Sequence, residues 1–115
     1  MYSDGNNHVE RRKFPRVEFR EPVLVRPTDA PQKNGCLSKD LSEGGLRLTF
    51  EHFEKPNTPV AVEFRLRPGE EMMFFEGRVA WVHQVPSSDR YQIGIEFLKK
   101  SEENQKNIRQ HVESD

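Results

Sequence analysis

Cysteine is nearly absent from this sequence, because Cys36 is the only one among 115 residues. An intrachain disulfide is therefore excluded, and a reducing cytosol suits such a chain best. The four histidines are dispersed, without a second histidine or a cysteine at ligand spacing, so we expect no metal site and interpret all four as surface residues. They are His8, His52, His83 and His111.

Long apolar runs and an excess of one charge are also missing. No stretch approaches the roughly 20 apolar residues of a membrane span, and the first ten residues, MYSDGNNHVE, lack the apolar core of a secretory signal. With 18 Lys and Arg against 19 Asp and Glu, the formal net charge is -1. The molecule as a whole therefore has no reason to bind DNA, RNA or an anionic membrane. We expect a soluble, cytoplasmic protein.

What the sequence does contain is a series of short alternating segments. Val60, Val62, Phe64 and Leu66 alternate with polar residues, which is typical of a strand with one buried and one wet face. We expect further strands at residues 17–25 (interrupted near Pro22), 36–40, 46–51, 72–84 with a bulge near Gly77, and 91–97. About six strands with short connections predict an all-β fold, either an antiparallel barrel or a partly closed sheet.

The last part of the chain changes character. Ser101, followed by Glu102 and Glu103, is typical of a helix N-cap with acidic residues in the first turn. Ile108 and Val112, four residues apart, would anchor this short C-terminal helix to the sheet. The length of the chain allows only one modest hydrophobic core. We therefore expect a flexible tail over 1–9 and one domain over 10–115, with an arm (10–16), a barrel (17–98) and a helix (about 101–112).

The arm and the residues just after it carry a concentrated positive charge. Arg11, Arg12, Lys13, Arg16 and Arg20 oppose Glu10 and Glu18, so residues 10–20 carry five minus two, a local +3. Pro15 disfavours a helix there, and little apolar surface holds the segment down, which predicts a flexible N-terminal arm. Phe14 would fix the base of the arm to the barrel. Taken alone, such a run is more often a solvated face than a binding site.

A second segment, Asp40-Leu41-Ser42-Glu43-Gly44-Gly45, is predicted as a turn between two strands. Taken alone it is an ordinary turn, since Asp, Ser and Gly are common turn formers. Together the two segments select one chemistry. Arginine pairs with phosphate or with guanine O6 and N7, a carboxylate accepts from guanine N1 and N2, and Ser and Gly let a phosphate approach the backbone.

These motifs resemble the PilZ domains, a family of bacterial receptors for the second messenger cyclic di-GMP. Arg11, Arg12 and Arg16 match the arginine-bearing segment of the family, and Asp40, Ser42 and Gly45 match its Asp/Asn-x-Ser-x-x-Gly motif. The closing Gly94-Ile95-Glu96-Phe97 is similar to the last strand of the family. The resemblance covers roughly residues 10–99.

The resemblance implies a six-stranded antiparallel β-barrel with a C-terminal α-helix, whose arm folds over cyclic di-GMP, often bound as an intercalated dimer. The closed arm would change the surface offered to a downstream protein partner. The expected ligand-binding residues are Arg11, Arg12, Arg16, Asp40, Ser42, Gly44 and Gly45. Lys13, Arg78 and Trp81 are further candidates, although Trp81 could equally fill the core and Arg78 could be a solvated outward residue.

No enzyme is predicted, and no cofactor. Ser42 lacks the Gly-x-Ser-x-Gly elbow and a recognisable histidine and acid pair, so nucleophilic catalysis is not expected. The leading hypothesis is a cyclic di-GMP receptor acting as an adaptor. The alternatives are a PilZ-like protein-interaction scaffold that uses no ligand and, less favoured, a small barrel that binds single-stranded nucleic acid.

Overall fold

The structure, a computed structural model, describes residues 14–28, 34–99 and 101–114. Within these ranges it contains seven strands and one helix. They are β1 (Val17–Glu18), β2 (Pro22–Pro27), β3 (Asn34–Ser42), β4 (Gly45–Phe50), β5 (Pro59–Phe64), β6 (Met73–Gln84), β7 (Tyr91–Lys99) and α1 (Glu102–Ser114).

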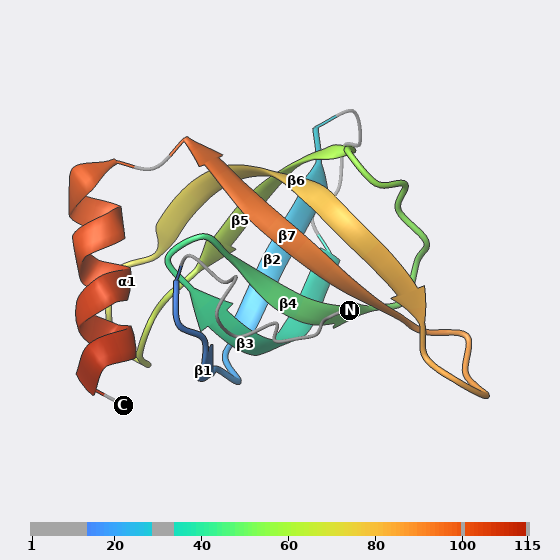
Figure 1. Cartoon of the computed structure of the whole chain (residues 1–115), viewed down its shortest axis with the longest axis horizontal. Helices are drawn as coiled ribbons and strands as arrows, with labels where there is room; N and C mark the ends of the chain where they lie inside the picture. Colours follow the sequence, from blue (N-terminus) through green and yellow to red (C-terminus); the bar gives the residue numbers. More distant parts are fainter. Residues whose placement is uncertain (1–13, 29–33, 100, 115) are drawn as a thin grey trace, which may run out of the picture.

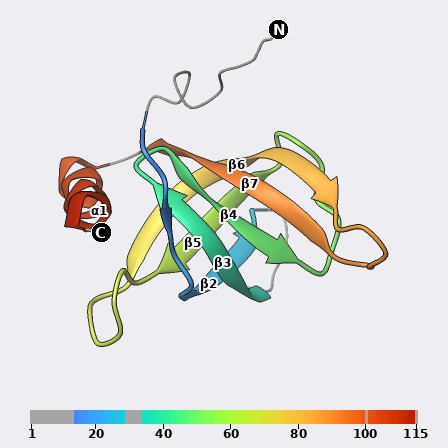
Figure 2. The ribbon, with the colours of Figure 1, turned by 60° about the horizontal axis from the view of Figure 1, so that its bottom comes forward.

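Strands β2 to β7 form a closed six-stranded antiparallel barrel (Figure 1). The strands follow the order β3-β2-β5-β6-β7-β4, and pairing between β3 and β4 closes the ring. The two-residue strand β1 adds to β3, with Val17 opposite Leu41 and Glu18 opposite Asp40. The expected barrel is therefore confirmed, and β1 lies beside it as an extra edge (Figure 2).

The core follows the predicted alternation most closely in β5. Val60, Val62 and Phe64 are buried there, whereas Ala61 and Glu63 are half-buried on the outer face. The ring of Phe64 stacks with that of Phe75, with centroids 5.4 Å apart, and Phe75 stacks with Phe97 at 4.2 Å. Three aromatic rings from three strands thus fill one end of the barrel.

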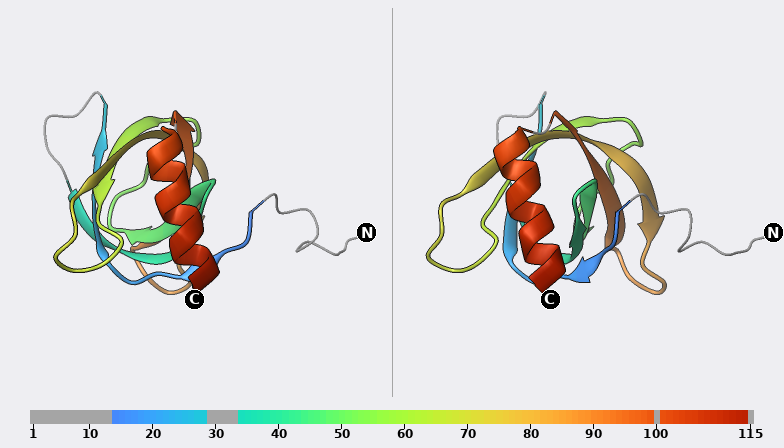
Figure 3. Two further views of the ribbon diagram at one scale, coloured as in Figure 1. Left: turned by 90° about the vertical axis from the view of Figure 1, so that its left-hand side faces the viewer. Right: turned by 60° about the vertical axis from the view of Figure 1, so that its left-hand side comes forward.

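Helix α1 lies across that end of the barrel (Figure 3). Its N-cap is as expected, since the Ser101 hydroxyl accepts a hydrogen bond from the Asn104 backbone N–H at 3.0 Å. Ile108 and Val112 are buried, as predicted. The interpretation of His111 as a surface residue was wrong: it lies one position before Val112 on the buried face, and its ring contacts that of Phe19 edge-on. Within the described ranges, no helix is long and apolar enough to cross a membrane.

Two local predictions need correction. The segment from Asp40 to Gly45 is not all turn, because β3 continues through Ser42 and β4 begins at Gly45, which leaves only two connecting residues. The pairing of β6 with β7 is irregular near Gly77, as expected, but the extra residue there is Leu98 on β7, because Glu76 opposes Lys99 and Gly77 opposes Phe97. The predicted change of inward parity in β6 comes at Ala80 instead. Val79 opposes Ile95 and Trp81 opposes Gly94, so Ala80 is the extra residue of a β-bulge.

Candidate functional site

The described end of the arginine segment, at Arg16, meets the acidic motif on the outer face of the barrel. Pairing of β1 with β3 brings Arg16 beside Asp40, and Arg16 Nη1 donates to Asp40 Oδ1 at 2.8 Å. Ser38, buried in β3, supports this arrangement, because its Oγ lies 2.9 Å from the Phe19 carbonyl oxygen and 2.8 Å from that of Glu21. Two segments 24 positions apart in sequence therefore share one site.

Asp40 is held by a second arginine that the sequence analysis did not single out. Arg47, on β4 opposite Asp40, donates from Nη2 to Asp40 Oδ2. Each oxygen of the carboxylate thus accepts from a different guanidinium, while the Asp40 side chain is only 10% exposed. Burial of a carboxylate is costly unless it is paired and hydrogen-bonded, and the two arginines supply both.

The connection after Ser42 is organised by its own hydroxyl. Ser42 Oγ accepts from the Gly44 N–H at 3.1 Å and lies 3.4 Å from the Gly45 carbonyl oxygen. The half-buried ring of Phe14 lies over Gly44, where a Cβ would come within 3.1 Å of its Cδ2. The base of the arm therefore packs on this connection, as expected for Phe14.

Trp81 forms the wall between two adjoining hollows. A larger one of 490 Å³, here called the basic hollow, has four cationic and two anionic lining side chains: Arg16, Arg20, Lys39 and Arg47 with Glu18 and Asp40. A smaller one of 210 Å³ is lined by Phe14, Ser42, Gly44 and Glu96 among others. Arg16 and Trp81 line both. This surface can take an anion together with a planar apolar group.

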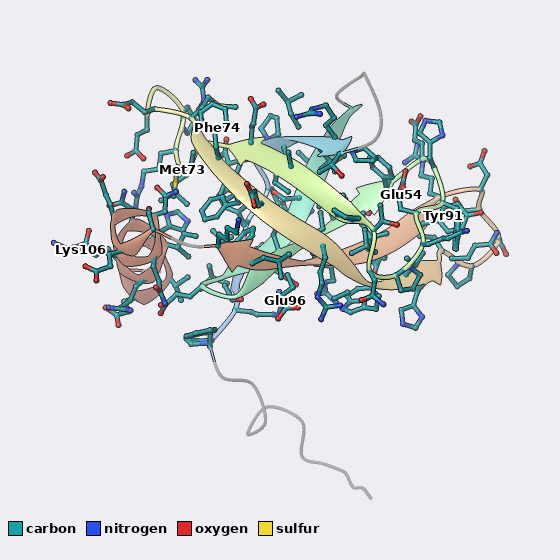
Figure 4. The ribbon with its side chains drawn as sticks, turned by 90° about the horizontal axis from the view of Figure 1, so that it is seen from above. Glu54, Met73, Phe74, Tyr91, Glu96 and Lys106 are labelled. Carbon is teal, nitrogen blue, oxygen red and sulfur yellow. The ribbon has the colours of Figure 1, made fainter. Side chains whose placement is uncertain are left out.

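The other candidates are distributed unevenly. Arg78 forms an ion pair with Glu96 at 2.6 Å and donates to Asn57, so it lies near the site but is already paired and lines neither hollow. Glu96 itself is labelled on the outer side of β7 in Figure 4. Gly45 is buried, and its Cα faces the backbone of β7. Arg11, Arg12 and Lys13 lie outside the described residues.

A separate groove of 610 Å³ lies between the β5–β6 loop and α1, beside the start of β6, where Met73 and Phe74 are labelled in Figure 4. None of the motif residues lines it. Among the described residues no group of three or more His, Cys, Asp and Glu side chains could hold a metal ion. The motif residues that the structure describes therefore lie around Asp40, away from this groove.

Comparison with known proteins agrees with this geometry. The family model of the PilZ domain matches residues 10–114. This chain belongs to the PilZ family. No curated protein matches it.

Solved PilZ structures share the fold at low sequence identity. The PilZ domain of YcgR from Escherichia coli, solved with c-di-GMP, is 15% identical with a TM-score of 0.71, and the match covers 90% of each chain. The Bacillus subtilis inhibitor of motility MotI/DgrA is 18% identical with a TM-score of 0.76, and its match covers 90% of this chain and 50% of that one. The K. pneumonia MrkH–c-di-GMP complex is 17% identical with a TM-score of 0.68, over 90% and 51%. The chain thus spans about half the length of MotI/DgrA and MrkH.

Proposed function

We propose that this protein is a bacterial, cytoplasmic cyclic di-GMP receptor that acts by binding and performs no catalysis. The observation that carries the proposal is the contact between Arg16 and Asp40, which joins the two motifs at the edge of two hollows. It is supported by membership of the PilZ family, in which the neighbours YcgR and MrkH were solved with this nucleotide.

The proposed recognition divides the ligand between the two motifs. The Asp40 carboxylate accepts from the N1 and N2 donors of a guanine, while Arg16 pairs with a phosphate or with the acceptor edge of the base. Ser42 and Gly44 shape the backbone beside the phosphates. Arg11, Arg12 and Lys13 add positive charge when the arm closes over the nucleotide.

The output is proposed to be a change of surface. Residues 10–115 act as one domain in this proposal, and closure of the arm over the occupied site offers a downstream protein a face that the free protein lacks. Because the two hollows adjoin the base of the arm at Phe14 and Arg16, ligand and arm can meet without rearrangement of the barrel.

Calorimetry with cyclic di-GMP, and with GMP as a comparison ligand, tests the proposal. We expect saturable binding of cyclic di-GMP by the wild type and weaker binding by Arg12→Ala, Arg16→Ala and Asp40→Asn. Loss of one hydrogen bond to a charged group lowers affinity by about ten- to a hundredfold. Arg90→Ala, at the opposite end of the strands from the Ser42–Gly45 connection, is the matched control.

Absence of binding by a folded wild type would contradict the proposal and favour a scaffold that uses no ligand. Equally tight binding of GMP would contradict the proposal as well, because it would show that the site recognises a single guanine nucleotide and not the cyclic dinucleotide. Wild-type affinity in the three variants would move the site elsewhere on the molecule.

A further inference from the structure

A single row of residues crosses four strands on the outer face of the barrel. Asp40 on β3 lies opposite Arg47 on β4, Arg47 lies opposite Gly94 on β7, and Gly94 lies opposite Trp81 on β6. Residues directly opposite each other in an antiparallel sheet point to the same face. Arg47 and Trp81 are therefore next-but-one neighbours on one surface, with only a glycine between them.

Gly94 makes room for the indole. A Cβ at residue 94 would lie 2.3 Å from Trp81 Nε1 and 2.4 Å from Trp81 Cε2, so the indole occupies the space that any other residue would fill. The bulge at Ala80 turns Trp81 to the outer face at this point. Trp81 is thus laid across β7 toward Arg47, where it forms part of the basic hollow.

Arg47 is only partly satisfied in this arrangement. Its Nη2 donates to Asp40, but its Nε is buried and has no acceptor among the residues that the structure describes. A guanidinium has five donors arranged in a rigid fork, so pairing through one end leaves the rest of the fork for another acceptor. The basic hollow, with 490 Å³ of space beside Arg47, is where such an acceptor would lie.

Asp40, in contrast to Arg47, has a partner at each of its side-chain oxygens. Both its oxygens accept from arginines in the structure. To accept from two donors of one guanine, the carboxylate has to share or give up these partners. Arg47 lies on β4, whereas Arg16 is placed by the pairing of β1 with β3. Release of Arg47 from Asp40 therefore leaves the contact between Arg16 and Asp40 undisturbed.

We propose that Arg47 is a nucleotide-binding residue that pairs with Asp40 when the site is empty and with the purine nucleotide when it is occupied, beside an indole that Gly94 positions for stacking. The inference rests on the proposed function and deepens it. It makes Arg47 a specificity-determining side chain and Gly94 a positioning residue. Stacking between a base, a guanidinium and an indole is favourable because all three are planar.

The test combines calorimetry with the fluorescence of Trp81, the only tryptophan of the chain. The wild type should show a saturable change of emission on addition of cyclic di-GMP, at the affinity measured by calorimetry. Arg47→Ala should bind about tenfold or more weakly. Arg47→Lys keeps the charge but not the fork, and should recover only part of this loss.

Gly94→Ala isolates the position of the indole. We expect an altered emission spectrum in the free protein and about tenfold weaker binding, since a stacked base loses its support. Gly35→Ala is the matched control, because its Cβ would meet nothing closer than Leu24 Cδ2 at 3.9 Å. Trp81→Leu, followed by calorimetry, replaces Gly94→Ala if circular dichroism shows that the latter does not fold.

The outcomes distinguish a failure of the proposed function from a failure of the inference about Arg47 and Trp81. If the wild type does not bind, the proposed function fails. If the wild type binds and Arg16→Ala and Asp40→Asn weaken binding, while folded Arg47→Ala and Trp81→Leu keep wild-type affinity, the inference is overturned and the proposed function stands. A lower melting temperature of Arg47→Ala with unchanged affinity assigns Arg47 to structure alone, and also overturns it.

Discussion

Gly45 is required for the packing of the barrel, independently of any ligand. A Cβ at this position would lie 1.9 Å from the Ile95 carbonyl oxygen and 3.2 Å from Glu96 Cα, both atoms of the β7 backbone. Such contacts cannot be relieved by a side-chain rotation, because the backbone itself would have to move. The motif glycine therefore allows the close approach of β4 and β7.

We expect Gly45→Ala to lower the free energy of unfolding by about 1–3 kcal/mol or more, as overpacking of a core does. Urea unfolding without ligand measures this, with Gly35→Ala as a control that should remain near the wild type. A Gly45→Ala protein of wild-type stability would contradict the packing argument. If the loss occurs, weaker ligand binding by this variant reports on folding and not on a ligand contact.

The thiol of Cys36 should make the free energy of unfolding depend on pH. Burial raises the pKa of its thiol from 9.0 to about 12, and Sγ donates to the Val23 carbonyl oxygen. The folded state thus favours the neutral thiol, so this stabilisation is complete below pH 9 and is lost as the pH rises toward 12. Cys36→Ser, which does not ionise there, should lose less stability than the wild type between these pH values in urea titrations.

The same burial should protect the thiol chemically. At pH 8 we expect a thiol reagent to modify Cys36 in the native protein at least about tenfold more slowly than in urea, because the thiolate is the reactive species. Equal rates in the two states would show that Cys36 is not held as the structure indicates.

Sequence reasoning identified some residues of the candidate site and missed others for a physical reason. Arg16 and Asp40 were recognisable because they belong to short motifs with a distinct chemistry. Arg47 was not recognised, and Gly94 was noted only as part of the last strand, since each acquires its place beside Asp40 and Trp81 only through cross-strand register, which depends on pairing between distant segments. Their residue types alone, an arginine and a glycine on alternating strands, are ordinary.

At the scale of elements, α1 is joined to the connection between β3 and β4 by one polar contact. Glu43, in the two-residue connection between β3 and β4, is buried and accepts from Arg109 Nη2 at 3.1 Å and from Arg109 Nε at 3.2 Å. Hydrogen bonding with Glu43, and then its charge, raises the pKa of Arg109. Beyond this pair, the Asn104 side-chain amide donates to the Phe74 carbonyl oxygen of β6 at 3.5 Å, and the buried side chains Ile108, His111 and Val112 pack α1 against the barrel.

Arg109→Ala should therefore loosen α1. We expect faster amide hydrogen exchange over the helix, because the buried Glu43 carboxylate loses its counter-charge and the helix loses a fixed contact. Lys106→Ala, at an exposed position of the same helix (Figure 4), is the control and should leave exchange unchanged. Equal protection in the two variants would mean that the Arg109–Glu43 contact does not hold α1.

The strands differed in how well the sequence predicted them. The clear alternation in β5 and β7 identified both strands within a few residues, because each has one face in the core. The extent of β3 was underestimated, since Asp40 and Ser42 are turn formers that are held in strand conformation by pairing with β1 and β4. Local propensity was overridden by tertiary pairing at the position that matters for the site.

For the molecule as a whole, binding and folding should be linked. The candidate site takes residues from β3, β4, β6 and β7, so it exists only in the closed barrel. A ligand that binds only the folded state at 100 times its dissociation constant adds about 2.7 kcal/mol of stability. We expect cyclic di-GMP to raise the melting temperature by on the order of 10 °C for a domain of this size.

Differential scanning fluorimetry with increasing cyclic di-GMP measures this shift, with GMP as the comparison. Asp40→Asn should show a smaller shift at the same concentration. A melting temperature independent of nucleotide, in a protein that binds it by calorimetry, would mean that the unfolded chain binds equally well.

The row from Asp40 to Trp81 also has a consequence for when the candidate site can form during synthesis of the chain. Its third member, Gly94, lies on β7, the last in chain order of the strands that the structure describes, and the Trp81 indole can pack over Gly94 only once β7 is paired between β4 and β6. Both sequence motifs are therefore synthesised before this row of residues can be complete. If the proposed site binds cyclic di-GMP, nascent chains that lack β7 should neither compete for the nucleotide nor be stabilised by it.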